Sequence, residues 1–266
     1  MADQQPYLVE VTPEGIATVT LNRPELHNAF NGELIEGLAD AFDDLGKQDG
    51  VRVVCVRGNG KSFSAGGDLA WMKRSAELTH EQNVEETLAL ASMLRTLNDC
   101  PKPTIALVHG NAYAGGMGLV AACDIGIASE DAVFCLSEVR LGLIAATISP
   151  YVIAAIGPRQ ARRYFLTAER FGAKEALSVG LVHEVVADAA GLDAARDRFV
   201  RHLIAAGPEA VAGSKRLIAH VAGKPIDSEL MLHTAKCIAE ARASEEGQEG
   251  LAAFFEKRKP RWAAMD

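Results

Sequence analysis

The sequence predicts an α/β protein with a helical C-terminal segment, and two observations support this. Over the first 190 residues, short strand patterns alternate with helical patterns and short loops, which is typical of helices packed on a sheet of buried strands. After about Leu192 only helical patterns follow. The length of 266 residues agrees with one large domain, or with one domain and an appendage.

The N-terminal half begins with a predicted hairpin. Residues 7–11 and 16–21 are rich in β-formers and flank the turn sequence Thr12-Pro13-Glu14-Gly15. Apolar residues spaced about 3.6 apart then predict a helix over 32–47, with Asn31 as its N-cap. The patterns that follow predict a strand over 51–57, a helix over 81–98, a strand over 104–108, a helix from Gly115 to Cys123 and a strand over 124–128.

The C-terminal part contains four helical patterns, over 192–206, 208–222, 227–242 and 244–257. These helices are too thin a layer to bury their own apolar faces, so we expect them to pack on the main body or on a neighbouring subunit. We therefore divide the chain into a core over 1–190 and a C-terminal helical oligomerisation segment over 191–266.

Composition excludes several classes of partner. A formal net charge of −8 argues against nucleic acid, whose phosphates need a basic face. No run approaches the roughly 18 apolar residues of a membrane span, and the polar N-terminus has no signal-peptide core. Five scattered cysteines indicate reduced thiols in a cytoplasmic protein. The seven histidines have no metal-site spacing, so we expect no metal.

Two glycine-rich stretches suggest a site that binds a carbonyl oxygen. The first is the loop KSFSAGGDL over 61–69, and the second is Ala114-Gly115-Gly116 at a predicted helix start. Glycine lets backbone approach a ligand, and the first N–H groups of a helix lack internal partners. One N–H from each stretch could converge on one oxygen, and each such preorganised donor would stabilise a developing oxyanion by about 3–4 kcal/mol. Glu138, after the next strand-like run, is the candidate group for moving a proton.

Several separated motifs, in the same order, resemble the crotonase (enoyl-CoA hydratase/isomerase) superfamily over nearly the whole chain. The resemblance implies a spiral of ββα units followed by a helical trimerisation segment, and a homotrimer or dimer of trimers. It also implies an acyl-CoA thioester substrate, with coenzyme A as part of that substrate and no other cofactor. The motifs are LNRP over 21–24 with Asn28-Ala29, the two glycine-rich stretches, Asp124-Ile125, SEVRLG over 137–142, Ala168-Glu169-Arg170, Gly180-Leu181-Val182 and FEKR over 255–258.

The resemblance assigns roles to individual residues. It implies that the backbone N–H groups of Ala65 and Gly115 hold the thioester oxygen, and that Glu138 is the second of the two glutamates that family hydratases use. The first of those glutamates falls on Gly118, which has no side chain to act. With one carboxylate, either Glu138 does both jobs or another group helps.

The resemblance also implies a set of substrate and coenzyme A contacts. Arg140 is a candidate for an extra carboxylate of the substrate, because on a strand it would share the face of Glu138, although a structural ion pair is the alternative. Asp68 either shapes the first loop or contacts the pantetheine. The remaining candidates are Arg23 for a phosphate, Ala29 and Leu69 beside the loops, and Phe254 and Lys257 for the adenine and phosphates, where a solvated terminal helix is the alternative.

Within the superfamily the chain is most similar to methylglutaconyl-CoA hydratases of leucine breakdown. That similarity implies hydration of 3-methylglutaconyl-CoA or a related branched 2-enoyl-CoA. Two alternatives stay open: a Δ3,Δ2-enoyl-CoA isomerase that uses Glu138 alone, and a non-catalytic acyl-CoA-binding homologue. The segments that carry the similarity are DLAWM over 68–72, LSEVR over 136–140, ISP over 148–150 and GQEGL over 247–251.

Overall fold

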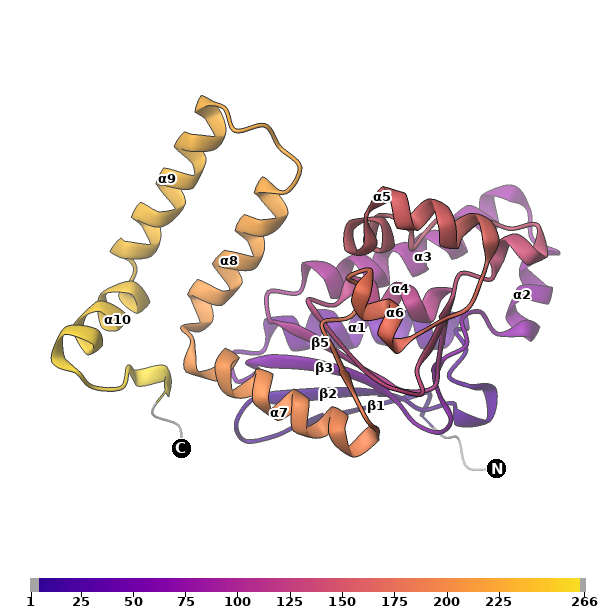
Figure 1. Ribbon diagram of the computed structural model, residues 1–266, viewed down its shortest axis with the longest axis horizontal. Helices are drawn as coiled ribbons and strands as arrows, with labels where there is room; N and C mark the ends of the chain where they lie inside the picture. The colour runs from indigo at the N-terminus through magenta and orange to yellow at the C-terminus, as the bar shows by residue number, and fades with distance from the viewer. Residues whose placement is uncertain (1–4, 264–266) are drawn as a thin grey trace.

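A computed structural model describes residues 5–263 as two β-sheets, a layer of helices on each side of the larger sheet, and a projecting helical arm (Figure 1). The larger sheet has the order β1-β2-β3-β5-β7-β10. Its first two strands form the predicted antiparallel hairpin, and the other neighbours pair in parallel. The strands are β1 Tyr7–Val11, β2 Ile16–Leu21, β3 Val53–Gly58, β5 Thr104–Val108, β7 Ile125–Ser129 and β10 Glu184–Val186.

The smaller sheet has the order β4-β6-β8-β9. Strands β4, β6 and β8 are parallel to one another, whereas β9 is antiparallel to β8. Each strand of the larger sheet from β3 to β7 is followed by a short strand of the smaller sheet and then by a helical segment, which gives the predicted ββα units. The short strands are β4 Ser62–Ser64, β6 Asn111–Tyr113, β8 Val133–Cys135 and β9 Phe171–Gly172.

Two long helices of the core, α1 and α3, follow the sequence prediction closely. α1 spans Gly32–Lys47, and the Asn31 side chain accepts a hydrogen bond from the N–H of Leu34 as its N-cap. α3 runs over His80–Asp99 behind a capping box formed by Thr79 and Gln82. The other helices are α2 Leu69–Ser75, α4 Gly115–Ala122, α5 Ser149–Thr167, α6 Ala173–Ser178, α7 Ala189–Ala205, α8 Pro208–Val221, α9 Ser228–Ala243 and α10 Glu245–Glu256, with 3-10 turns η1 Pro24–Leu26, η2 Glu138–Leu141 and η3 Arg261–Ala263.

One local prediction is wrong: Glu138 to Arg140 do not continue a strand. The short strand β8 ends at Cys135, and the chain then turns into η2. Residues two apart in a 3-10 helix point in different directions, so Arg140 does not share a face with Glu138. The Arg140 guanidinium instead donates a 2.7 Å hydrogen bond to the carbonyl of Ala168, at the end of α5.

The hydrophobic core lies on both faces of the larger sheet. On one face, α1, α3, α4 and α5 cover it in a continuous cluster of buried side chains. On the other face, α7 packs Leu192, Ala195 and Val200 against Ile105 and Ile127 of the sheet. α7 therefore belongs to the packed body, and the chain leaves that body after it.

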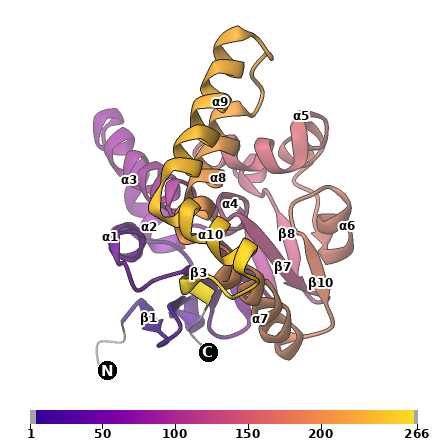
Figure 2. The same cartoon turned by 90° about the vertical axis from the view of Figure 1, so that its left-hand side faces the viewer.

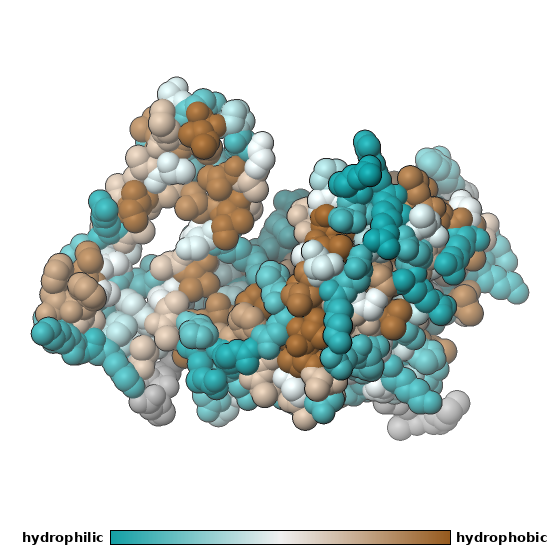
Figure 3. Space-filling view, viewed as in Figure 1, coloured by the Kyte–Doolittle hydropathy of each residue, from teal (hydrophilic) through white to brown (hydrophobic). Residues whose placement is uncertain are grey.

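Helices α8, α9 and α10 form an arm that stands away from the body (Figures 1 and 2). Ala253 is the one arm residue between 208 and 256 that is buried. Hydrophobic side chains lie open on its surface (Figure 3), among them Ile218, Ile238 and Phe254. Within residues 5–263, no helix combines the length and the hydropathy that crossing a bilayer requires.

A buried amide joins two loops beneath the smaller sheet. Asn28 is fully buried, and its side-chain nitrogen lies 2.8 Å from the carbonyl oxygens of Asn59 and Ser62 and 3.2 Å from that of Phe63. Its side-chain oxygen accepts a hydrogen bond from the N–H of Arg23. Because the backbone of Asn28 is also left-handed, with φ of 55°, asparagine suits the position better than most residues.

We expect Asn28→Ala to lower the free energy of unfolding by about 3 kcal/mol, because it leaves buried carbonyls without donors and puts alanine in a left-handed conformation. Urea denaturation at a fixed protein concentration measures this. Asn98→Ala, on the surface of α3, is the matched control, and its expected change is below about 0.5 kcal/mol. Equal stability of the two variants would contradict the role of Asn28.

Candidate active site

The candidate site lies at one edge of the smaller sheet. Strands β4, β6 and β8 are adjacent and parallel, so their carboxyl ends meet at the same edge. Gly67 follows the end of β4, Gly115 follows the end of β6, and Glu138 follows the end of β8, each within three residues. Carboxyl ends of parallel strands are where α/β proteins commonly place ligands. The sheet thus brings together the two glycine-rich stretches and the predicted acid–base group.

The first glycine-rich loop has a different free N–H from the one predicted. The N–H of Ala65 donates a 2.9 Å hydrogen bond to the carbonyl of His27, so it is already used inside the protein. The loop is then clamped on Phe30, whose N–H donates to Gly66 and whose carbonyl accepts from Asp68. The N–H of Gly67, between these bonds, has no acceptor within residues 5–263. We therefore replace Ala65 by Gly67 as the candidate oxyanion donor of this loop.

Asp68 holds this loop in shape. One of its carboxylate oxygens accepts from the N–H groups of Ala70 and Trp71 as the N-cap of α2, and the other forms a 2.8 Å ion pair with Arg23. Burial raises the pKa of Asp68, but the N–H of Trp71, the Arg23 guanidinium and the N–H of Ala70 outweigh it and leave the pKa below its ordinary value. Asp68 is thus kept ionised as an anchor between the loop and α2.

Arg23 is engaged in the same anchor. Besides Asp68, its guanidinium donates to the carbonyl of Ala29, and its side chain is only 14% exposed. A phosphate contact by Arg23 would have to share the guanidinium with these two acceptors. Ala29 is itself buried, while Leu69, at the start of α2, is 82% exposed beside the loop.

The second stretch places its donor at the start of α4. Ala114 has φ of 48° and donates to the carbonyl of Cys135, which ties the helix start to the end of β8. Gly115 is then the first residue of α4, and its N–H has no acceptor among the described residues. A Cβ at Gly115 would lie 2.7 Å from the ring of Phe30, so the close packing requires glycine.

The two loops touch each other through Gly66. A Cβ added to Gly66 would lie 2.8 Å from the Cβ of Ala114 and 3.7 Å from the backbone nitrogen of Gly115. Phe30 packs against Gly115 and is hydrogen-bonded to Gly66, so one residue fixes both strand ends. This contact places the loop that contains Gly67 against the start of α4, where the N–H of Gly115 lies. A two-donor oxyanion site requires such proximity of its two loops.

Glu138 is a desolvated carboxylate. Its Oε2 atom is buried and has no hydrogen-bond partner within residues 5–263. Burial raises the pKa of Glu138 above its ordinary value, and the residue's own backbone N–H offsets this only in part. A carboxyl group with a raised pKa and an unpaired oxygen is suited to take up a proton and return it.

The position of the missing glutamate, Gly118, lies inside α4 and is fully enclosed. A Cβ built there would meet the side chain of Ile148 at 2.2 Å. The other buried residues of α4 are apolar or glycine, so this helix presents no acid or base to the site. Sequence reasoning identified the absent side chain but had no signal that Ile148, 30 residues away, fills its space.

The C-terminal candidates for coenzyme A binding, Phe254 and Lys257, lie far from the candidate site of their own chain. Phe254 and Lys257 are exposed at the end of α10. Figure 1 shows α10 and α2 at opposite ends of the molecule's longest axis. A contact between these residues and coenzyme A would therefore require a second copy of the chain.

A cavity of about 550 Å³ lies elsewhere, at the C-terminal end of α4, and contains none of the site residues described above. Within residues 5–263, no group of three or more His, Cys, Asp or Glu side chains is arranged to hold a metal ion. All five cysteines are free thiols. The cavity is lined by Asn98, Val120, Ala121, Cys123, Asp124, Pro150, Tyr151, Ala154, Ala155, Gly180, Leu181 and His183.

Comparisons with known proteins agree with this fold. A model of the enoyl-CoA hydratase/isomerase family matches residues 11–265. A putative enoyl-CoA hydratase of Thermus thermophilus is 36% identical over 96% of this chain and 100% of its own length. The crystal structure of an enoyl-CoA hydratase from Shewanella pealeana superposes with a TM-score of 0.94, at 44% identity over 97% of this chain and 96% of that one. AtuE of Pseudomonas aeruginosa superposes with a TM-score of 0.93, at 36% identity over 97% and 99% of the two chains.

The raised pKa of Glu138 predicts how stability depends on pH. The folded state favours the protonated acid, so this contribution to stability is present below the ordinary pKa of glutamate and is lost as pH rises through the raised value. We expect Glu138→Gln to unfold at a higher temperature than the wild type at pH 7.5, because it removes a buried, unpaired charge. The difference should shrink as the pH falls towards 4.

Differential scanning calorimetry at a series of pH values measures this effect. Glu130→Gln serves as the control, because Glu130 is a solvent-exposed carboxylate that pairs with Lys174 on the surface. A Glu138→Gln variant that is less stable than the wild type at every pH would refute the desolvated state of Glu138.

Proposed function

Since the chain belongs to the enoyl-CoA hydratase/isomerase family, we propose that it adds water to the double bond of a 2-enoyl-CoA, with Glu138 as the acid–base group. The observation that carries this proposal is the unpaired, buried Oε2 of Glu138, at the same sheet edge as the free N–H groups of Gly67 and Gly115. Glu138 would carry the proton, and the two N–H groups would bind the oxyanion. The addition of water needs both functions.

In the first step the carboxylate of Glu138 takes a proton from a water molecule. The water oxygen forms a bond to C3 of the acyl group, and the electron pair of the C2–C3 double bond moves to the thioester oxygen as an enolate. The N–H groups of Gly67 and Gly115 stabilise this charge, by an amount on the order of 3–4 kcal/mol per donor in comparable sites. Both donors are set in place before the reaction, because Phe30 holds both strand ends.

In the second step Glu138, now a neutral acid, returns its proton to C2. The enolate collapses to the thioester, and the net change is addition of H to C2 and OH to C3. One carboxylate serves both steps, because burial raises its pKa above the ordinary value of glutamate and so favours the protonated form that returns the proton. Water and proton then arrive from the same side of the double bond.

For the substrate we propose 3-methylglutaconyl-CoA or a related branched 2-enoyl-CoA. This choice rests on the resemblance of residues 68–72, 136–140, 148–150 and 247–251 to hydratases of leucine breakdown. Arg140 is the proposed contact for the extra carboxylate of the substrate. Its bond to Ala168 uses one of its five N–H donors and leaves the others for a ligand.

A second candidate is a Δ3,Δ2-enoyl-CoA isomerase. The enclosed Gly118 favours it, because moving one proton between C2 and C4 needs one carboxylate and no bound water. The two activities differ in whether solvent oxygen enters the product. A non-catalytic acyl-CoA binder is the third candidate, and it would bind coenzyme A esters without turnover.

We expect the purified protein to hydrate 3-methylglutaconyl-CoA, and Glu138→Gln to lower kcat by about 10²- to 10⁴-fold with little change in KM. Mass spectrometry of products formed in oxygen-18 water supplies the readout. Asp131→Asn, a surface substitution next to β8, is the control and should retain activity. A product shifted in double-bond position without solvent oxygen would establish the isomerase instead. Full activity of Glu138→Gln would exclude the proposed role of Glu138.

We further propose that the arm, together with the rest of the 191–266 segment, assembles the chain into a trimer or a dimer of trimers in the cytoplasm. The support is the exposure of apolar arm residues, including Phe254 at 76% and Phe255 at 75%. Such a face is unstable in water unless another surface covers it.

Light scattering after size-exclusion chromatography should give three or six times the 28.3 kDa chain mass. Replacing both exposed phenylalanines by aspartate, as Phe254→Asp with Phe255→Asp, should shift the protein towards monomers, because buried carboxylates would have to be desolvated. Glu240→Lys, at an exposed acidic position of α9, is the control. A monomeric wild type at micromolar concentration would refute the proposed assembly.

A further inference from the structure

The contact between Gly118 and Ile148 decides which acid–base groups the site can hold. Gly118 lies in the first turn of α4, and Ile148 is the N-cap residue of α5. A Cβ on residue 118 would lie 2.2 Å from the Cγ2 atom of Ile148 and 2.8 Å from its Cβ. Both distances are far below van der Waals contact, so any side chain at position 118 competes with Ile148 for the same space.

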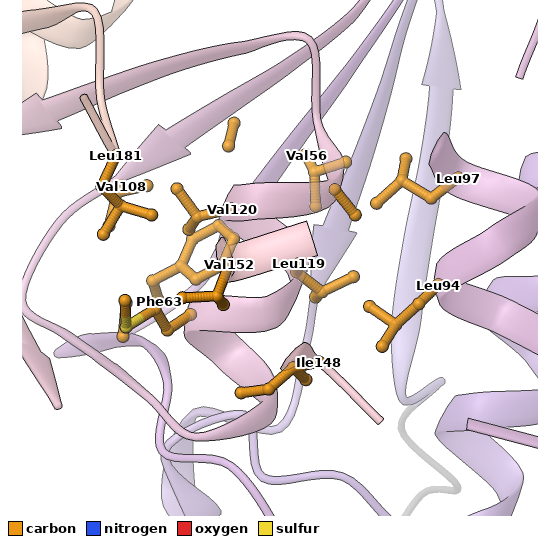
Figure 4. Close-up of a cluster of buried hydrophobic side chains, with 14 of the residues drawn as sticks. Val56, Phe63, Leu94, Leu97, Val108, Leu119, Val120, Ile148, Val152 and Leu181 are labelled. Carbon is orange, nitrogen blue, oxygen red and sulfur yellow. The ribbon is translucent and has the colours of Figure 1, made fainter. Parts of the chain in front are cut away.

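Ile148 cannot simply swing aside. Its side chain is only 2% exposed and is part of the main hydrophobic cluster. Figure 4 shows it with the other buried side chains of the cluster, below Leu119 and Val152 in this view. A β-branched side chain has few accessible rotamers, and one of the two blocking atoms is its Cβ, which no rotamer moves. The backbone is held as well, since the Ile148 carbonyl accepts the N–H of Val152.

We infer that Ile148 is the residue that restricts this site to a single carboxylate. It keeps position 118 a glycine and closes the α4 side of the site with apolar atoms, so proton transfer depends on Glu138, which follows the end of the neighbouring strand β8. This inference rests on the proposed function for its catalytic meaning. The steric exclusion of a side chain at position 118 does not depend on any catalytic activity.

The inference also explains why a glutamate cannot be restored at 118 by one substitution. Gly118→Glu would force its first side-chain carbon into Ile148 before the carboxylate could reach the site. Removing the side chain of Ile148 opens that space. A site with two carboxylates therefore requires that Gly118 and Ile148 be substituted together.

A stability cycle tests the steric part. We expect Gly118→Ala to lower the melting temperature by about 3–8 °C through overpacking. Ile148→Gly removes both blocking atoms and leaves a cavity, which an alanine at 118 partly fills. The double variant Gly118→Ala with Ile148→Gly should therefore melt at or above the temperature of Ile148→Gly alone. Ile148→Val keeps both blocking atoms, so it should give Gly118→Ala no relief.

Gly32→Ala is the matched glycine control, because nothing lies within 4 Å of a Cβ at that helix position, and it should not lower the melting temperature. If Ile148→Gly does not fold, Ile148→Ala removes the closer of the two blocking atoms and takes its place. A Gly118→Ala variant as stable as the wild type, or effects of the two positions that simply add, would overturn the inference.

An activity cycle tests the catalytic part. Gly118→Glu with Ile148→Gly should hydrate a linear substrate, 2-butenoyl-CoA, at least about 10-fold faster than Ile148→Gly alone. Gly118→Glu with Ile148→Val should show no such gain. Equal rates for the two double variants would overturn the role of Ile148. The proposed function fails separately, if the wild type turns over no enoyl-CoA while the stability cycle still shows coupling.

Discussion

The buried amide of Asn28 is the interaction on which the rest of the site depends. Its side chain holds the residues that follow β2 against the turn between β3 and β4, in a place where water cannot replace its hydrogen bonds. The left-handed backbone at His27 and Asn28 directs the His27 carbonyl to the N–H of Ala65 and leads the chain to Phe30. Phe30 then clamps Gly66 and Asp68 and packs on Gly115. One satisfied polar group thus helps to fix the two loops that carry the candidate oxyanion donors, Gly67 and Gly115.

The two acidic side chains of the site, Asp68 and Glu138, differ in how their charge is compensated. Asp68 and Arg23 are both shielded from solvent, but they neutralise each other and have several hydrogen bonds. Glu138 has no such partner for its buried oxygen, and its pKa rises as a result. An anchoring carboxylate is stabilised in its charged form, whereas a carboxylate that must release and accept a proton is not. The contrast between the two acids supports a structural role for one and a chemical role for the other.

Apolar packing around α4 leaves no space for a second acidic side chain. Two-glutamate hydratases need a side chain where this protein has Gly118, and Ile148 fills that volume. The hydrophobic core therefore extends to position 118, and α4 carries no carboxylate there. The same principle applies to the arm, whose exposed apolar residues have no place in the core of their own chain and are available to a neighbouring copy.

Elements that are long enough to show a period could be predicted from the sequence. The hairpin, α1 with its Asn31 cap and β5 have the predicted bounds, and the family motifs identified Gly115, Glu138 and the absence at Gly118. Three-residue strands such as β4, β6 and β8 are too short to show an alternating pattern. The end of β8 could therefore not be located from the sequence, and residues of η2 were treated as a continuation of the strand. The choice between Ala65 and Gly67 was also beyond sequence reasoning. It depends on the position of the His27 carbonyl, which accepts the N–H of Ala65. The lack of space for a side chain at position 118 depends on the position of Ile148. Only the tertiary structure decided these points, because hydrogen bonds and packing between distant segments leave no local periodicity in the chain.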